Sequence, residues 1–186
     1  MALLARAART ILCSVLILGP LARAGSAAQA PTEDQVKAVF VFNFSHFVEW
    51  PPQAFAVPTE PFVIGVLGSD AFGDRLDEAV RGEKLDQHPL SVRRFHSITE
   101  VTSCQILFID KAEAGKLRQI IASLDHRSTL TVADAEAAAE RGVMMQFVTE
   151  NNRIRLRINV EAARLASLTI SSNLLRPAEI VATAGD

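Results

Sequence analysis

The segment Phe62–Leu67, FVIGVL, decides the fold class of this chain. It is a short run of uncharged, apolar residues, which is typical of a strand buried on both faces in a parallel sheet. The chain then turns at Gly68-Ser69-Asp70, and residues 71–81 carry apolar side chains at helical spacing. A buried strand followed by a helix is the repeating unit of α/β proteins.

This alternation continues towards the C-terminus. The sequence predicts further strands at 90–95, 106–110 and 129–132, and helices at 112–124 and 134–141. Strands that alternate with helices predict a mostly parallel sheet flanked by helices. No repeat or low-complexity block interrupts the pattern, so we expect a single α/β domain.

The C-terminal part has a different pattern. Residues 143–149 and 153–159 flank a turn at Glu150-Asn151-Asn152, and apolar residues alternate with arginines along the second run. This alternation predicts a β-hairpin whose last strand has one apolar face and one basic face. A short helix at 160–166 and an apolar segment at 168–175 then close the expected domain.

Upstream of the first strand, residues 39–51, VFVFNFSHFVEWP, contain four of the ten phenylalanines and the only tryptophan. Thr32 and Gln35 can form a reciprocal cap at the start of a helix that should end before Pro51. Polar residues interrupt the run, so it is too polar and too short for a membrane span of about 20 apolar residues. We expect a helix, apolar nearly all round, that enters a core or meets a partner.

The first 24 residues have the pattern of a secretory signal peptide. Arg6 and Arg9 precede an apolar stretch at 11–18, and Ala22-Arg23-Ala24 offers a cleavage site. We therefore expect residues 1–24 to be a signal peptide and residues 25–186 to form the mature domain in the periplasm.

Charge and cysteine content limit the function classes. Residues 1–24 hold three arginines and no acid, so the formal charge changes from −2 to −5 after cleavage. A mildly acidic protein does not suit nucleic-acid binding, which normally shows a basic patch. Only Cys104 survives processing, so no intrachain disulfide can form, and its apolar setting predicts a buried thiol.

No motif marks a catalytic, metal or cofactor site. The glycines between Gly65 and Gly73 follow neither the dinucleotide fingerprint nor the P-loop, although the turn could hold a phosphate. A hydrolase would have to use residues such as Ser171 and His126, which no nucleophile motif marks. None of the four histidines has a second metal-type ligand at the spacing of a zinc site. These histidines are His46, His88, His96 and His126.

Two groups of residues are candidates for binding. Phe44, Phe47 and Trp50 could contact a partner or a second copy of the chain, or could simply pack in the core. Arg153, Arg155 and Arg157 could grip a carboxylate or phosphate on one strand face. The same arginines could instead pair with acids such as Glu150 or protect an edge strand.

Four motifs in sequence resemble the YfiR family of exported bacterial repressor proteins. They are Lys37-Ala38 with Asn43-Phe44, Phe47 and Trp50-Pro51; Leu67 to Gly73 with Leu76; Cys104 with Leu107-Phe108-Ile109; and Gly142-Val143-Met144 through Arg155, Ile158-Asn159, Ala163 and Leu168 to Ser171-Ser172 and Leu174-Leu175. Together they extend over about residues 33 to 176, nearly the whole expected mature chain.

The resemblance implies a small periplasmic α/β protein, commonly dimeric. Such a protein binds the periplasmic sensor region of an inner-membrane diguanylate cyclase and represses it, and its release raises cyclic di-GMP and favours biofilm. The family also occurs beside histidine kinases and outer-membrane receptors. The best-studied members use paired cysteines to stabilise the fold. This chain differs from them, because its expected mature part has only Cys104.

We therefore expect a non-enzymatic periplasmic regulator without a cofactor, whose partner is a diguanylate cyclase or a histidine kinase. The alternative is a periplasmic small-molecule binding module. That module would use the turn at Gly68–Gly73 or the face of Arg153, Arg155 and Arg157.

Overall fold

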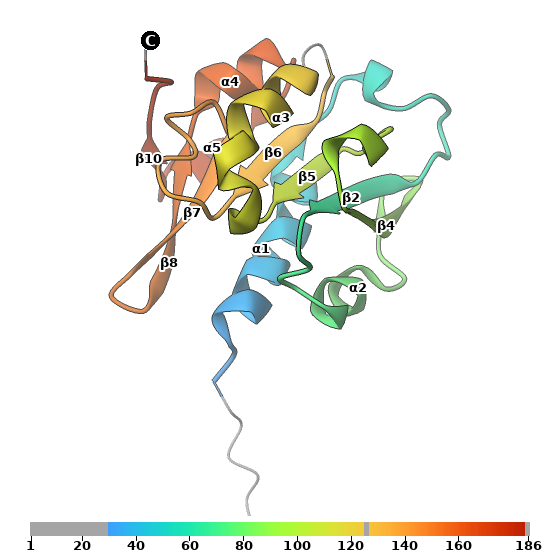
Figure 1. Cartoon of the computed structure of the whole chain (residues 1–186). Coiled ribbons are helices and arrows are strands. Elements are labelled where there is room, and N and C mark those ends of the chain that lie inside the picture. The colour runs from blue at the N-terminus through green and yellow to red at the C-terminus, as the bar shows by residue number, and fades with distance from the viewer. Residues whose placement is uncertain (1–29, 125–126, 185–186) are drawn as a thin grey trace, which may run out of the picture. The chain divides into compact units, whose positions relative to one another are not determined.

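All six residues of β2 (Phe62–Leu67) are buried between β4 (His88–Phe95) and β5 (Ile106–Ile109), and both pairings are parallel. The computed structural model describes residues 30–124 and 127–184 (Figure 1). The signal peptide predicted for residues 1–24 lies outside the described residues.

The strands beside β2 belong to one eight-stranded sheet, in the order β10-β8-β7-β6-β5-β2-β4-β3. Pairing is parallel from β4 to β7 and antiparallel for the β7–β8 hairpin and for β3 with β4. The remaining strands are β3 (Lys84–Leu85), β6 (Leu130–Ala133), β7 (Met145–Glu150), β8 (Arg153–Ile158) and β10 (Glu179–Ile180). The predicted α/β fold with a mostly parallel sheet is confirmed.

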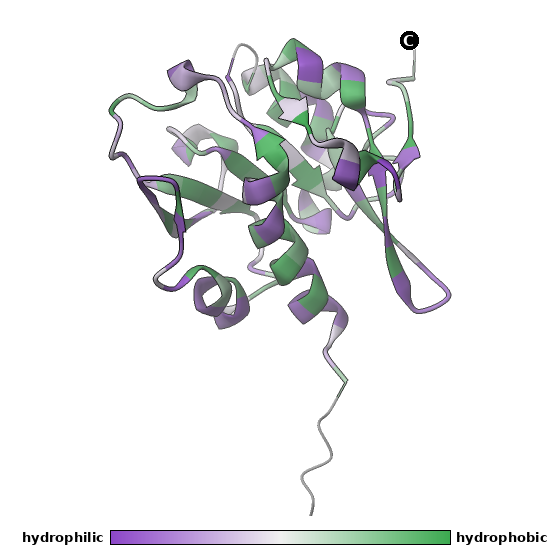
Figure 2. Ribbon diagram, turned by 180° about the vertical axis from the view of Figure 1, so that it is seen from behind, coloured by the Kyte–Doolittle hydropathy of each residue, from purple (hydrophilic) through white to green (hydrophobic). Residues whose placement is uncertain are grey.

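Helices cover both faces of the sheet. One core contains residues of α1 (Glu33–Phe47), α2 (Asp74–Val80), α4 (Val160–Leu165) and α5 (Ser172–Leu175), and the other contains α3 (Leu117–Ser123). Strand β5 shows how one apolar run serves both cores, because Ile106 and Phe108 enter the first core while Leu107 and Ile109 enter the second. Figure 2 shows α1 in front of largely hydrophobic strands.

The ends of α1 follow from local chemistry. The Gln35 N–H donates to Thr32 Oγ1 at 3.3 Å, and the Thr32 N–H donates to Gln35 Oε1 at 2.8 Å, which confirms the predicted reciprocal cap. After Phe47 the chain becomes extended as β1 (Val48–Glu49), which pairs antiparallel with β9 (Thr169–Ile170). Short 3₁₀ helices occupy Pro52–Ala54, Ile98–Glu100 and Lys111–Lys116, so the helix predicted at 112–124 is α-helical only from Leu117.

The helix predicted at 134–141 is wrong, because this segment forms consecutive turns. Ala137 has a φ of 50°, which an α-helix does not allow. The Ala139 N–H donates to Gln146 Oε1 at 3.1 Å, and the Ala139 carbonyl accepts from Asn159 Nδ2 at 3.0 Å. Buried amide side chains from β7 and from the N-cap of α4 thus pair with the backbone groups that a helix would pair internally.

Candidate functional site

The aromatic residues of α1 are mainly part of the core. Phe44 is 0% exposed, and its ring stacks on Phe147 of β7 with centroids 5.9 Å apart. Phe44 therefore has no surface to offer a partner, contrary to the expectation that it could form an interface. Phe47 is only partly buried and remains a candidate contact.

Trp50, just beyond β1, is held at the opposite end of α1 from the cap. Its indole Nε1–H donates to the carbonyl oxygen of Gln105 at 3.2 Å, and its ring meets Phe62 edge-on at 4.9 Å. Both contacts anchor Trp50 to the strands of the sheet. The half-buried ring keeps some surface, so partner contact by Trp50 stays a prediction.

The arginine row on β8 divides into paired and unpaired members. Arg157 lies 2.9 Å from Glu179 and 3.4 Å from Glu140, and Arg155 lies 3.4 Å from Glu150. Arg153 has no acidic partner among the described residues. Of the three, Arg153 therefore has the guanidinium most available to a partner carboxylate.

The structure brings the start of α1 and the hairpin together. Two adjoining hollows of about 290 and 430 Å³ share Phe40, Arg153 and Ile154 in their walls, and Val36 lines the larger one. We call these four residues the α1–hairpin groove. Thr149 Oγ1 donates to Glu33 Oε1 at 2.9 Å and ties the hairpin to the first turn of α1. The sequence did not identify Val36, Phe40 or Ile154 as contact residues, because the groove forms only when segments that are distant in the sequence pack together.

A buried ion pair lies between α1 and the end of β6. Lys37 Nζ is 3.1 Å from Asp134 Oδ2 and 2.7 Å from Glu33 Oε1, and the Lys37 residue is only 7% exposed. Burial lowers the pKa of Lys37, but hydrogen bonds to Glu33 and Asp134 outweigh burial and raise it overall. This pair fixes α1 against the sheet, and no motif in the sequence signals it.

The turn at Gly68–Gly73 is closed by its own side chains. Asp70 Oδ1 accepts the N–H groups of Phe72 and Gly73 at 3.3 and 3.1 Å. Arg94 Nε pairs with Asp70 Oδ2 at 2.6 Å, and the Arg94 guanidinium also pairs with Asp77. Since Asp70 already occupies these N–H groups, the turn offers little to the phosphate or ligand that the sequence allowed there.

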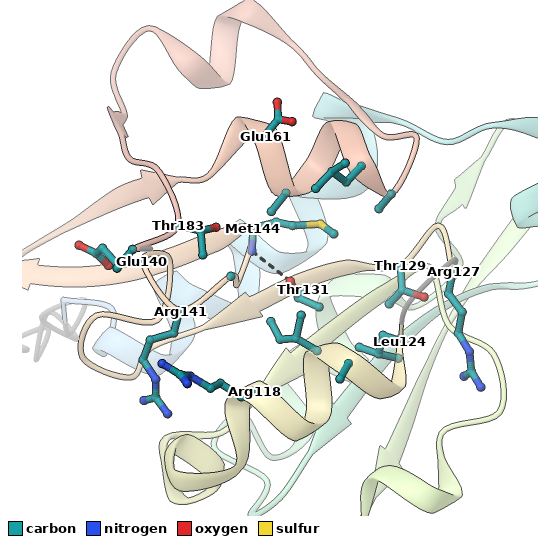
Figure 3. A pocket seen from close by; sticks show the side chains of 17 residues that line it. Arg118, Leu124, Arg127, Thr129, Thr131, Glu140, Arg141, Met144, Glu161 and Thr183 are labelled. Atoms are coloured by element: carbon teal, nitrogen blue, oxygen red, sulfur yellow. Dashed lines mark hydrogen bonds between the residues drawn. The ribbon is translucent and has the colours of Figure 1, made fainter. Parts of the chain in front are cut away.

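A separate pocket, with a volume of about 500 Å³, lies between α3 and α4 (Figure 3). Its walls come from five segments, which are α3 with Leu124, the stretch from Arg127 to Thr131, the turn at 140–144, α4 with Ala166, and Thr183–Ala184. Glu140 Oε2 in its wall is buried and has no hydrogen-bond partner among the described residues. No sequence signal pointed to this pocket, because its residues come from five separated segments.

A family model described as YfiR/HmsC-like matches residues 34–179. The chain belongs to this family. Membership of the YfiR/HmsC-like family supports a periplasmic regulator of the YfiR type. A comparison with curated proteins found no match.

Solved structures support the fold of this YfiR/HmsC-like chain. One is the ABC domain in complex with L-Trp from Streptococcus pneumonia, at 13% identity and a TM-score of 0.52, covering 80% of this chain and 60% of the other. Another is a conserved domain protein from Vibrio cholerae O1 biovar El Tor, at 13% identity and a TM-score of 0.53, covering 82% and 61%. The chain thus spans about 60% of the length of these structures, and the likeness shows the fold alone.

The region matched by the YfiR/HmsC-like model includes both sides of the α1–hairpin groove. In residues 30–124 and 127–184, no helix is long and apolar enough to cross a membrane.

Proposed function

We propose that this protein is a non-enzymatic periplasmic regulator that binds the periplasmic sensor region of an inner-membrane diguanylate cyclase and represses it. A histidine kinase with a periplasmic sensor region is the alternative partner. Membership of the YfiR/HmsC-like family is the observation that carries the proposal. The mature domain, residues 25–186, acts as a homodimer in this proposal.

The α1–hairpin groove is the surface we assign to the partner. Half-buried Val36, Phe40 and Ile154 give it an apolar centre, and exposed Arg153 gives it a charged rim. An apolar centre with a polar rim is the usual anatomy of a protein interface. Val39 lies outside the groove itself, but it is 50% exposed and follows Val36 by three positions, a spacing that places two residues side by side on a helix surface, so it adds apolar surface next to the groove. A partner segment with an apolar side chain next to an acidic one would fit this chemistry.

The test uses two valines that are almost equally exposed. Val39 is 50% exposed on α1, and Val57 is 54% exposed in the loop before β2. Tagged mature protein carrying Val39→Asp should lose a membrane partner that wild type captures from solubilised inner membranes, because a charge at an apolar contact must be desolvated. Val57→Asp should capture the partner normally.

The cellular arm measures cyclic di-GMP in a strain that lacks the gene. Deletion should raise cyclic di-GMP and attachment. Complementation with wild type or with Val57→Asp should restore low values of both, whereas complementation with Val39→Asp should leave them high. Unchanged cyclic di-GMP on deletion would count against a cyclase partner. Equal capture by both valine variants would remove the α1–hairpin groove from the proposal.

A further inference from the structure

We propose that the pocket between α3 and α4 binds a small organic carboxylate with an apolar body, a role distinct from the α1–hairpin groove. This inference does not depend on the proposed function, because it concerns binding by the protein alone.

The size and walls of the pocket suit an apolar body. Its volume of about 500 Å³ lies within the range of small-molecule sites, which is roughly 300–1,000 Å³. Ile121 of α3, Leu165 of α4 and Met144 line it. Leu165 is 73% exposed, so a large apolar side chain lies beside the pocket without being covered by the protein core. A ligand with a hydrocarbon body would remove part of this surface from water.

Two hydroxyl groups in the pocket have hydrogens left to donate. Thr131, which is 2% exposed, accepts the Met144 N–H at 3.0 Å through Oγ1. Thr183 Oγ1 accepts from Asn159 Nδ2 at 2.8 Å. Neither hydroxyl donates a hydrogen bond within the part of the chain that the structure describes. A hydroxyl carries one donor and a carboxylate offers only acceptors, so a ligand carboxylate would satisfy them.

Arginine side chains supply positive charge at the pocket. Arg141 Nη2 donates to the carbonyl of Ala114 at 2.7 Å, and Arg127 Nη1 donates to the carbonyls of Val101 and Thr102 at 3.0 and 3.2 Å. Among the described residues, neither arginine is paired with a carboxylate. Carbonyl partners hold the guanidinium groups in place without cancelling their charge.

The two acids in the described wall of the pocket each lie near an arginine outside it, although Arg157 is closer to Glu179, at 2.9 Å, than to Glu140. Glu161 makes two hydrogen bonds with Arg164, at 2.9 and 2.6 Å, and Glu140 lies 3.4 Å from Arg157. Among the described lining residues, three arginines, Arg118, Arg127 and Arg141, stand against these two acids, so the formal charge of the wall is positive. Together with the two free hydroxyl hydrogens, this charge selects an anionic head group over a neutral one.

The experiment uses octanoate as the probe on the purified mature protein, with calorimetric titration and thermal unfolding as readouts. Octanoate should bind and raise Tm, because a ligand that binds the native state stabilises it. Acetate lacks the apolar body and 1-octanol lacks the charge, so each should bind at least about tenfold more weakly. Equal binding of octanoate and 1-octanol would overturn the proposal, because the head group would then play no part.

Two variants locate the site. Arg141→Gln should weaken octanoate binding about tenfold or more, while Arg81→Gln, at an exposed arginine on the end of α2, should leave it unchanged. Leu165→Ser changes an exposed side chain that the core does not need, so it should fold normally and also weaken binding. No binding by wild type, or unchanged binding by Leu165→Ser and Arg141→Gln, would overturn the assignment.

Discussion

The ring of Phe44 on α1 lies against the ring of Phe147 on β7, with centroids 5.9 Å apart and planes inclined by 22°. Phe40 meets the same Phe147 ring edge-on at 6.0 Å, so one residue of the hairpin contacts two successive turns of α1. Since Phe40 also lines the α1–hairpin groove, the geometry of the groove depends on this aromatic packing.

Phe44→Ala should lower the free energy of unfolding by about 3–5 kcal/mol, since it leaves a cavity at a fully buried position. Urea unfolding followed by circular dichroism measures the change. Val39→Ala, at the exposed side of the same helix, should change stability by less than about 0.5 kcal/mol. Similar losses for both variants would show that Phe44 is not the core residue described above.

Lys37→Met should destabilise the protein by about 3–5 kcal/mol, because it leaves the mostly buried Asp134 carboxylate without its cation. The double variant Lys37→Met/Asp134→Asn should recover much of that loss, since no buried charge then remains. A double-mutant cycle in urea gives the coupling energy. Additive effects of the two substitutions would argue against a coupled pair.

Cys104 should not react with a thiol reagent in the native protein at pH 8. Burial raises the pKa of its thiol to about 12, against an ordinary value of 9.0, and the residue is only 5% exposed. The reactive thiolate is therefore scarce and covered. Reaction with Ellman's reagent should follow the unfolding curve in urea, and rapid modification of native protein would contradict this expectation.

The same raised pKa predicts how stability depends on pH. The folded state keeps the Cys104 thiol protonated, whereas the unfolded chain loses the proton above about pH 9. The contribution of Cys104 is thus complete below pH 9 and is lost as the pH rises towards about 12. Wild type should lose more stability than Cys104→Ala between pH 9 and pH 11, as measured by urea unfolding at each pH.

Asn159→Ala should cost about 2–4 kcal/mol, because this fully buried amide caps α4 and also satisfies two groups in other segments. The turns at 134–141 should then open more often, and trypsin should cleave faster after Arg141. Asn173→Ala, at an exposed position, is the control and should leave both stability and cleavage unchanged.

The sheet could be predicted well from the sequence because the pattern of apolar residues within each strand shows that it is a strand. The apolar run of β2 and the alternating pattern of β8 both reflect which faces are buried. The prediction of a helix at 134–141 failed because helix propensity depends on local sequence alone, whereas tertiary contacts decide the structure of this segment. Gln146 and Asn159 hydrogen-bond to Ala139 from further along the chain, and tertiary contacts of this kind override the helix preference of an Ala/Glu-rich segment.

The candidate sites were less predictable than the fold. Phe44 and Phe47 share a helix, yet only the packing of β7 shows that Phe44 is covered while Phe47 keeps some surface. The arginine row was visible in the sequence, but the partners of Arg157 come from segments that the pattern could not place beside it. Thr131 and Thr183 come together only in the tertiary structure, so their spacing in the sequence gives no motif that could predict the pocket.

The contact between Phe44 and Phe147 also bears on the order in which the chain can fold. The first helix of the described residues packs against one of the later strands, and the hydrogen bond between Glu33 and Thr149 spans 116 positions. Contacts so distant in sequence require closing a long loop before they stabilise anything. During synthesis, the face of α1 that Phe147 covers must therefore stay bare until the hairpin emerges, and this face is available to chaperones throughout that interval.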